Sequence, residues 1–221
     1  LDFTVFKPTA IASTQILKKV SSNKSLDKQE KMLFEKSLDR FNKICLLAHE
    51  KNVRVLVDAE ESWIQNAIDE IVLSMMMKYN KEKAVVFNTS QMYRHDRLNY
   101  LKTLHDKALK NNFFVGIKLV RGAYIEKENR RARRNNYLSP ICSSKELTDQ
   151  NFNNGVSYIL SNLDRISLFS GTHNEESIYK IINIMDTKKI NRDDPKIWFG
   201  QLYGMSDNIT FNLASEGFNV I

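Results

Sequence analysis

Two kinds of hydrophobic periodicity alternate along the whole chain, and this alternation limits the fold more than any single motif. Short runs rich in β-branched and aromatic residues have the composition of strands. Seven such runs are predicted as strands, at residues 3–10, 53–58, 84–88, 114–120, 166–170, 197–202 and 218–221. The segments between them place apolar residues three or four apart, which predicts amphipathic helices.

The helical spacing is clearest at residues 32–48 and 64–75, and further helices are predicted at roughly 95–110, 147–163, 175–186 and 206–216. Asn174 stands where it could cap the helix that begins at Glu175. Ser206 and Gly217 stand just before and just after the last helix, as an N-cap and a C-terminal glycine would.

Strands that alternate with helices every few tens of residues predict an α/β fold with parallel strands, either a doubly wound sheet or a (β/α)8 TIM-like barrel. Polar side chains at the C-terminal ends of the predicted strands favour the barrel, because those ends converge on one rim there. These strand-exit residues are Lys7, Asp58 with Glu60, Asn88 with Gln91, Lys118 with Arg121, Thr172 with His173, and Gln201 with Tyr203. Seven strands do not close a standard barrel, so we expect an incomplete one.

Length and composition fit one folded domain. The chain has 221 residues, 42% of them hydrophobic and 27% charged, with only 7 Gly and 3 Pro, which excludes collagen-like and mostly disordered classes. The longest apolar stretch, at 71–77, is far shorter than the ~20 residues that span a bilayer, and residues 1–10 lack the pattern of a signal peptide. Since the chain does not start with Met, we expect residues 1–221 to be one barrel domain truncated at both ends.

The formal net charge of +7 could favour an anionic partner, and the densest cationic cluster is RRARR at 130–134. A solvated helix face is favoured over a nucleic-acid patch there, because no aromatic residues are interleaved with the arginines. The two cysteines, Cys45 and Cys142, have no metal-ligand spacing, and we expect neither a disulfide nor a metal site. Glycine-rich loops of the Rossmann or P-loop type are missing from the sequence.

Several strand exits carry residue types suited to an anionic cofactor or substrate. The strongest signal is KLVRGAY at 118–124, where two cations precede small residues and an aromatic, as a site for a flat anionic cofactor would need. Lys7 could anchor a carboxylate or phosphate, although its sequence position is equally consistent with an exposed surface lysine. Of the carboxylates Asp58, Glu60 and Glu61, two are interpreted as acids of the first helical turn.

The same residues carry a resemblance to a known family. The segments VFKPTA, VDAEESWIQNAID, NTSQMY, KLVRGAYIEKE, SPICSSKELTD, GTHN and FGQLYGMSD follow one another in the order found in proline dehydrogenase. The chain therefore resembles this FAD-dependent enzyme, which also forms one domain of the bifunctional proline-utilisation flavoproteins. KLVRGAY followed by THN and QLYGM is the specific part of the match.

The resemblance implies a (β/α)8 barrel with FAD and L-proline at the strand ends. It implies that Lys7 pairs with the proline carboxylate, that Asp58 braces the substrate side, and that Tyr124 and Leu202 are walls of the substrate pocket. The positions that match cofactor contacts are Gln91, Lys118, Val120, Arg121, Gly122, Ala123, Ser143, Lys145, Thr172, His173, Asn174 and Gln201. The family's first barrel strand and its carboxylate-binding arginines are expected before residue 1 and after residue 221.

The activity implied is oxidation of L-proline to Δ1-pyrroline-5-carboxylate by hydride transfer to FAD, in proline catabolism, with electrons passed to a quinone. Implied partners are a pyrroline-5-carboxylate dehydrogenase and a membrane surface, with no nucleic acid. The implied location is the bacterial cytoplasm at the inner membrane, or the mitochondrion in a eukaryote. Two alternatives stay open: a Schiff-base aldolase-like barrel that uses Lys7 or Lys118, and a basic module that binds nucleic acid or membranes.

Overall fold

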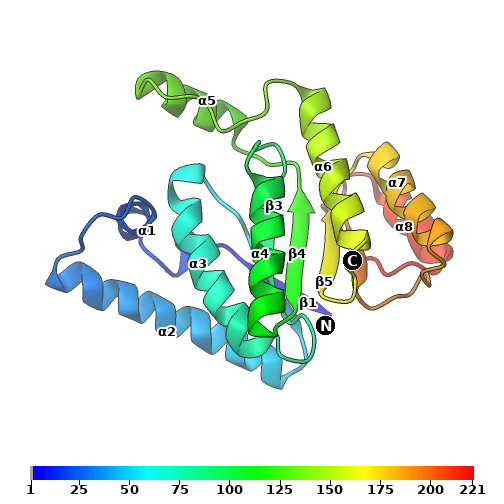
Figure 1. Cartoon of the computed structure of the whole chain (residues 1–221), viewed down its shortest axis with the longest axis horizontal. Coiled ribbons are helices and arrows are strands. Elements are labelled where there is room, and N and C mark those ends of the chain that lie inside the picture. Colours follow the sequence, from blue (N-terminus) through cyan, green and yellow to red (C-terminus); the bar gives the residue numbers. More distant parts are fainter. Residues whose placement is uncertain (1) are drawn as a thin grey trace.

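The computed structural model describes residues 2–221, and its centre is one parallel sheet whose strand order is the order of the chain (Figure 1). The strands are β1 (Phe3–Phe6), β2 (Arg54–Val57), β3 (Val86–Gln91), β4 (Val115–Val120), β5 (Ile166–Gly171) and β6 (Ile197–Gly200). A doubly wound sheet reverses its order at a switch point. This sheet winds in one direction only and forms a six-stranded half-barrel, so the prediction of an α/β barrel is confirmed at that level.

Helices join successive strands, and α3, α4 and α6 lie side by side along the sheet in Figure 1. The helices are α1 (Thr14–Ser21), α2 (Lys28–Glu50), α3 (Ser62–Tyr79), α4 (Arg97–Asn111), α5 (Ile125–Arg134), α6 (Lys145–Leu160), α7 (Glu175–Thr187) and α8 (Asp207–Ser215). A short 3-10 turn, η1 (Pro8–Ala10), follows β1. Helix α5 extends away from the sheet at the upper edge of Figure 1.

Alternate residues of each strand face opposite sides, because side chains alternate along a strand. On the convex side, valines, isoleucines and leucines pack against the helices and form the larger core. On the concave side, Phe3, Leu56, Phe87 and Phe169 form a separate aromatic cluster. The Arg54 guanidinium lies 5.2 Å from the ring centroid of Phe3 within the same layer. The sheet therefore has two different faces, and the concave one is largely aromatic.

Two of the predicted strands differ in the structure. The strand expected at 3–10 ends at Phe6, because Pro8 cannot donate a ladder hydrogen bond and instead begins the 3-10 turn. The strand expected at 218–221 is reduced to a single parallel bridge between Phe199 and Val220, so the prediction of seven strands is wrong by one among the described residues. Helix α1 was not predicted at all.

The predicted caps have mixed outcomes. Asn174 caps α7 as expected, since its side chain accepts a hydrogen bond from the backbone N–H of Ser177. Ser206 precedes α8 but makes no capping hydrogen bond, because its backbone is left-handed with φ of 60°. Gly217 has φ of 83°, the conformation expected of a glycine after a helix. Cys45 and Cys142 are both free thiols, as expected.

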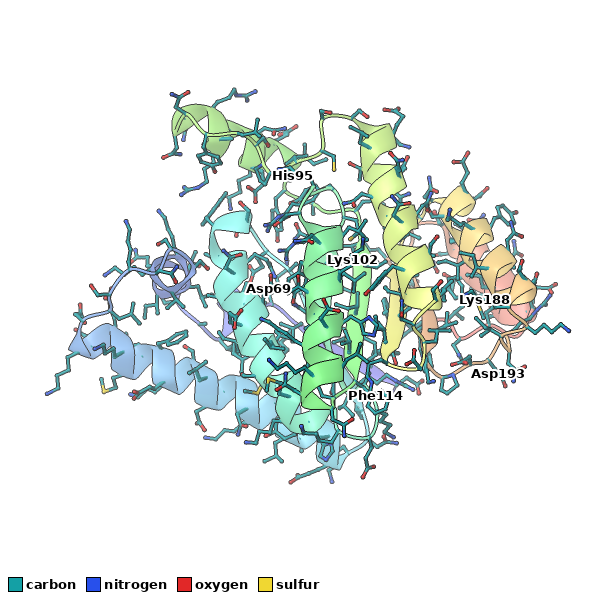
Figure 2. The ribbon with its side chains drawn as sticks, viewed as in Figure 1. Asp69, His95, Lys102, Phe114, Lys188 and Asp193 are labelled. Carbon is teal, nitrogen blue, oxygen red and sulfur yellow. The ribbon has the colours of Figure 1, made fainter. Side chains whose placement is uncertain are left out.

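A buried polar network joins the convex face of β3 to α3 and α4. Asp69, labelled on α3 in Figure 2, forms a 2.7 Å ion pair with Arg97 on α4, and both side chains are at most 7% exposed. The same carboxylate accepts hydrogen bonds from Asn88 on β3 and from Gln65 one turn earlier on α3. The network fixes the positions of α3 and α4 relative to β3.

The described residues contain neither a membrane-spanning helix nor a cluster of metal ligands. Between residues 2 and 221, no helix is long and apolar enough to cross a bilayer. Within the same residues, no three His, Cys, Asp or Glu side chains gather in a way that could bind a metal ion.

Candidate active site

The C-terminal ends of the strands open onto one cavity of about 850 Å³, which lies within the range of roughly 300–1,000 Å³ common for ligand pockets. The predicted site residues that line it are Lys7, Asp58, Gln91, Lys118, Val120, Arg121, Gly122, Ala123, Tyr124, Lys145, Thr172, His173, Asn174, Gln201 and Leu202. Ser143 is the exception: it is exposed in the loop before α6 and does not line the cavity. The floor consists of concave-face residues, mainly Phe3, Leu56 and Phe169.

Lys7 stands at the exit of β1 with its ammonium group beside Tyr124. Its Nζ donates a 3.3 Å hydrogen bond to the Tyr124 hydroxyl and lies 5.9 Å from the centroid of that ring. The bond to Tyr124 raises the pKa of Lys7, against a smaller opposing effect of burial, and the nearby carboxylates of Asp58 and Glu60 raise it further. Lys7 is therefore a permanent cation at the cavity wall.

Lys118 and Asp58 form an ion pair across the cavity floor. Lys118 lies on β4 and its Nζ donates to Oδ1 of Asp58, which follows β2. The side chains are 14% and 24% exposed, so the pair is mostly shielded from solvent. The register of the sheet explains the meeting, because Lys118 is paired with Thr89, and the residue after Val57 lies beside Thr89 on the concave face.

Arg121 ties three segments together at the exit of β4. Its guanidinium donates to Asp149 Oδ1 (2.6 Å), Thr172 Oγ1 (2.7 Å) and Ser177 Oγ (3.0 Å), and it lies over the ring of Phe152 at 4.6 Å. These bonds fix its plane at the cavity wall.

Asp149 is a contributor to this wall that sequence reasoning did not single out. Its second carboxylate oxygen accepts a 2.7 Å bond from Lys145. Burial raises the pKa of Asp149, but the bonds to Lys145 and Arg121 outweigh it and hold the pKa below its usual range. The spacing of four residues between Lys145 and Asp149 on one helix was the available signal.

Gln91 and the rim glycines fit a flat, polar ligand. The Gln91 side chain is 4% exposed and donates through Nε2 to the carbonyl of Glu60 at 3.1 Å. Its Oε1 has no partner within the part of the chain that the structure describes. A buried amide oxygen without a partner on a cavity wall is suited to accept a hydrogen bond from a ligand. Gly171 and Gly200 are neighbours in the sheet, and a Cβ on Gly200 would collide with the ring of Phe169. The missing side chain at Gly200 therefore leaves room for the Phe169 ring of the cavity floor.

The acidic segment after β2 does not behave as expected. Two of the carboxylates Asp58, Glu60 and Glu61 are expected in the first turn of a helix, but α3 begins only at Ser62 and has no acid in its first turn. Glu60 instead accepts from the backbone N–H and hydroxyl of Thr9, and Glu61 pairs with Lys127. The interpretation is wrong because these long-range partners bind the carboxylates before the helix starts.

Helix α5 packs against the N-terminus of α3. The fully buried carboxylate of Glu128 accepts from the backbone N–H and hydroxyl of Ser62, both at 2.6 Å. The Arg131 guanidinium lies 4.4 Å from the ring centroid of Trp63. Arg131 of the RRARR cluster is thus used in packing, whereas Arg130, Arg133 and Arg134 are exposed. Helix α5 holds Tyr124 in place at the mouth of the cavity.

The segment after β6 is the most open part of the wall. Leu202 lines the cavity with a side chain that is 67% exposed. Tyr203, which sequence reasoning grouped with the strand exits, is fully exposed and does not line the cavity. The left-handed backbone of Gly204 and Ser206 explains why this segment turns outward before α8.

Comparison with known proteins identifies one family over nearly the whole chain. The family model described as proline dehydrogenase matches residues 5–221. The carbapenem antibiotics biosynthesis protein CarD of Pectobacterium carotovorum is 37% identical over 220 residues, which cover 100% of this chain and 56% of that protein. Mitochondrial proline dehydrogenase 1 of Drosophila melanogaster is 36% identical over 201 residues, which cover 86% of this chain and 30% of that protein. The chain thus spans about half, or less, of these relatives.

Solved structures show the same fold. Proline utilization A (PutA) from Bdellovibrio bacteriovorus, inactivated by N-propargylglycine, superposes with a TM-score of 0.84 at 23% identity, over 98% of this chain and 21% of that one. PutA from Corynebacterium freiburgense superposes with a TM-score of 0.83 at 17% identity, over 100% of this chain and 22% of that one. At these identities the likeness concerns the fold.

Proposed function

Because this chain belongs to the proline dehydrogenase family, we propose that it oxidises L-proline to Δ1-pyrroline-5-carboxylate in proline catabolism, with FAD as the hydride acceptor. The observation that carries the proposal is the convergence of Lys7, Lys118 and Arg121 on one cavity above an apolar floor. The uninterrupted strand order supports the view that residues 1–221 belong to one domain of the (β/α)8 type.

The cavity wall suits FAD. The residues that would hold it are the matching positions on β3 to β6, chiefly Gln91 with its free acceptor, the braced guanidinium of Arg121, and the Lys118 ammonium. FAD, when bound, supplies an acceptor for the hydride. The protein contributes fixed donors and cations, which need no rearrangement because Asp58, Asp149 and Thr172 already hold them.

The substrate side is formed by Lys7, Tyr124, Asp58 and Leu202. The Lys7 ammonium has donors free beyond its bond to Tyr124, so it would bind the carboxylate of proline. Tyr124 and Leu202 would pack against the pyrrolidine ring, and the aromatic floor would exclude water. Oxidation removes a hydride from the carbon next to the ring nitrogen and a proton from the nitrogen, so the residues named act by orienting the substrate.

The Schiff-base alternative is weaker. A nucleophilic lysine must be neutral, which requires a lowered pKa. Tyr124 raises the pKa of Lys7 instead, and the Nζ of Lys118 is engaged in a hydrogen bond to Asp58. Borohydride trapping of a lysine adduct with a carbonyl substrate would revive this alternative.

The decisive experiment is a spectrum of the purified full-length protein. We expect a flavin absorption band that bleaches anaerobically on addition of L-proline, with formation of a product that reacts with o-aminobenzaldehyde as a pyrroline does. A protein without flavin, or one whose flavin is not reduced by proline, would refute the proposal.

We propose a quinone as the acceptor of the electrons, and a pyrroline-5-carboxylate dehydrogenase as the consumer of the product. Arg130, Arg133 and Arg134 are exposed on α5, the helix that follows the cavity-lining Tyr124, and they support a transient contact with an anionic membrane surface, at the bacterial inner membrane or within the mitochondrion of a eukaryote. A nucleic-acid role has less support, since Arg131 is committed to Trp63. Proline-dependent reduction of a soluble quinone analogue tests the acceptor.

A further inference from the structure

Glu60 is a buried carboxylate that has no role in the proposed chemistry, although it lies near Lys7, the lysine proposed to bind the substrate. The residue is 6% exposed, and it lies between the end of β2 and the start of α3. Its Oε1 accepts a 2.9 Å hydrogen bond from the backbone N–H of Thr9, and its Oε2 accepts a 2.7 Å bond from the Thr9 hydroxyl. The two bonds clamp one residue from both sides.

Thr9 belongs to the turn that Lys7 begins. In this turn the backbone N–H of Ala10 donates to the carbonyl of Lys7, and the N–H groups of Ile11 and Ala12 donate to the carbonyl of Pro8. The N–H of Thr9 lies in the first turn of η1, where helical geometry supplies no partner. Glu60 fills that role and thereby fixes the backbone two residues after Lys7.

Glu60 is itself held rigidly. Its backbone N–H donates to Oε1 of Gln65 at 2.9 Å, and its carbonyl accepts from Nε2 of Gln91 at 3.1 Å. Gln65 in turn donates to Asp69, the centre of the buried network behind β3. The carboxylate therefore connects the turn of Lys7 to a frame built from α3 and β3.

We infer that Glu60 is a positioning residue of the substrate site: its carboxylate holds the Lys7 turn so that the ammonium group points into the cavity beside Tyr124. The inference rests on the proposed function, because it assigns Lys7 to the proline carboxylate. Glu60 accepts hydrogen bonds from Thr9 and does not line the cavity, so its effect on the substrate runs through Lys7.

The test is a double-mutant cycle between Glu60 and Lys7 in the full-length protein, with KM for proline, kcat and flavin content as readouts. Glu60→Ala removes both bonds to Thr9 and is expected to raise KM by about tenfold with kcat and flavin content within about twofold of wild type. In a Lys7→Ala background the same change should raise KM by less than about twofold, because there is no ammonium left to position.

Two further variants separate positioning from general damage. Glu60→Gln can still accept the Thr9 N–H through its amide oxygen and donate to the Thr9 hydroxyl, so KM should stay within about threefold of wild type. Glu61→Gln is the matched control, since Glu61 is adjacent and equally buried but its partner is Lys127 on α5. If Glu61→Gln raises KM as much as Glu60→Ala does, loosening of the helix start explains the effect and the inference falls.

The outcomes distinguish the inference from the function beneath it. A wild-type protein that does not oxidise proline overturns the proposed function and this inference with it. A wild-type protein that does oxidise proline, but in which Glu60→Ala has the same effect with and without Lys7, overturns the inference alone. If Glu60→Ala does not fold, the cycle is run with Thr9→Val, which removes the hydroxyl donor and should show the same dependence on Lys7.

Discussion

Replacing Lys7 with alanine tests the central assignment of the site. The Lys7 ammonium is charged at every practical assay pH, because the bond to Tyr124 raises its pKa above the ordinary 10.5. Among residues 2–221, only one of its donors is used, in the 3.3 Å bond to Tyr124. The others are free for the substrate, so Lys7→Ala should act on the binding of proline and leave the cofactor in place.

The size of the effect follows from the kind of bond that is lost. A hydrogen bond to a charged group is worth about 1.5–3 kcal/mol, and each 1.4 kcal/mol corresponds to a factor of ten. We therefore expect KM for L-proline to rise about ten- to hundredfold. The flavin content should change by less than about 20%, because Lys7 lies at the first strand and the braced cations Lys118 and Arg121 lie elsewhere on the wall.

The assay is steady-state oxidation of proline over a wide range of concentration, with flavin content read from the visible spectrum of the same preparation. Lys127→Ala is the matched control. Lys127 also lies near the Tyr124 ring, at 6.0 Å, but it is exposed and paired with Glu61 outside the cavity, so its loss should change KM less than about twofold. An unchanged KM in Lys7→Ala, or an equal rise in Lys127→Ala, refutes the role given to Lys7.

Three further changes test other parts of the structure. Asp69→Ala removes the buried partner of Arg97 and leaves it only the partly exposed Asp96, at 3.2 Å. This change should lower the free energy of unfolding by about 3–5 kcal/mol in urea titrations, and a loss below about 1 kcal/mol contradicts the buried network. Gly122→Ala adds a Cβ where φ is 131° and where the Tyr93 ring lies 2.6 Å away. It should lower the free energy of unfolding by about 1–3 kcal/mol and reduce the flavin content. Full flavin occupancy would count against a role for the close packing at Gly122. The pKa of Asp149 in the folded state is below its ordinary 3.8. The ionised carboxylate therefore stabilises the fold fully at pH values above 3.8, and this stabilisation is lost as the pH falls through the lower, folded-state pKa. Asp149→Asn should weaken the fall of the unfolding free energy at acid pH and release Arg121, and an unchanged fall argues against this pair.

Much of the fold was predictable because it depends on neighbours in sequence. The alternation of strand-like and helical periods predicted five of the six strands nearly in place, and the polar strand exits predicted which end of the sheet carries the site. Helix α1 was missed because it is short and packs against α3 through few apolar positions, chiefly Ile16 and Leu17. The prediction of a strand at 218–221 was wrong because a four-residue apolar run does not reveal whether a neighbouring strand is present on both sides.

The site likewise has features that the sequence predicted and features that only the tertiary structure decided. Residue types at the strand ends, such as KLVRGAY and GTHN, determined that a cationic, glycine-lined rim would form, since side-chain alternation and parallel winding bring those ends together in any barrel of this kind. The partners were decided only by tertiary structure: Lys118 meets Asp58 across 60 residues, Glu60 meets Thr9 across 51, and Glu128 meets Ser62 across 66. No short-range pattern encodes such pairs, because each depends on strand register and helix rotation, which are set by the packing of the whole core.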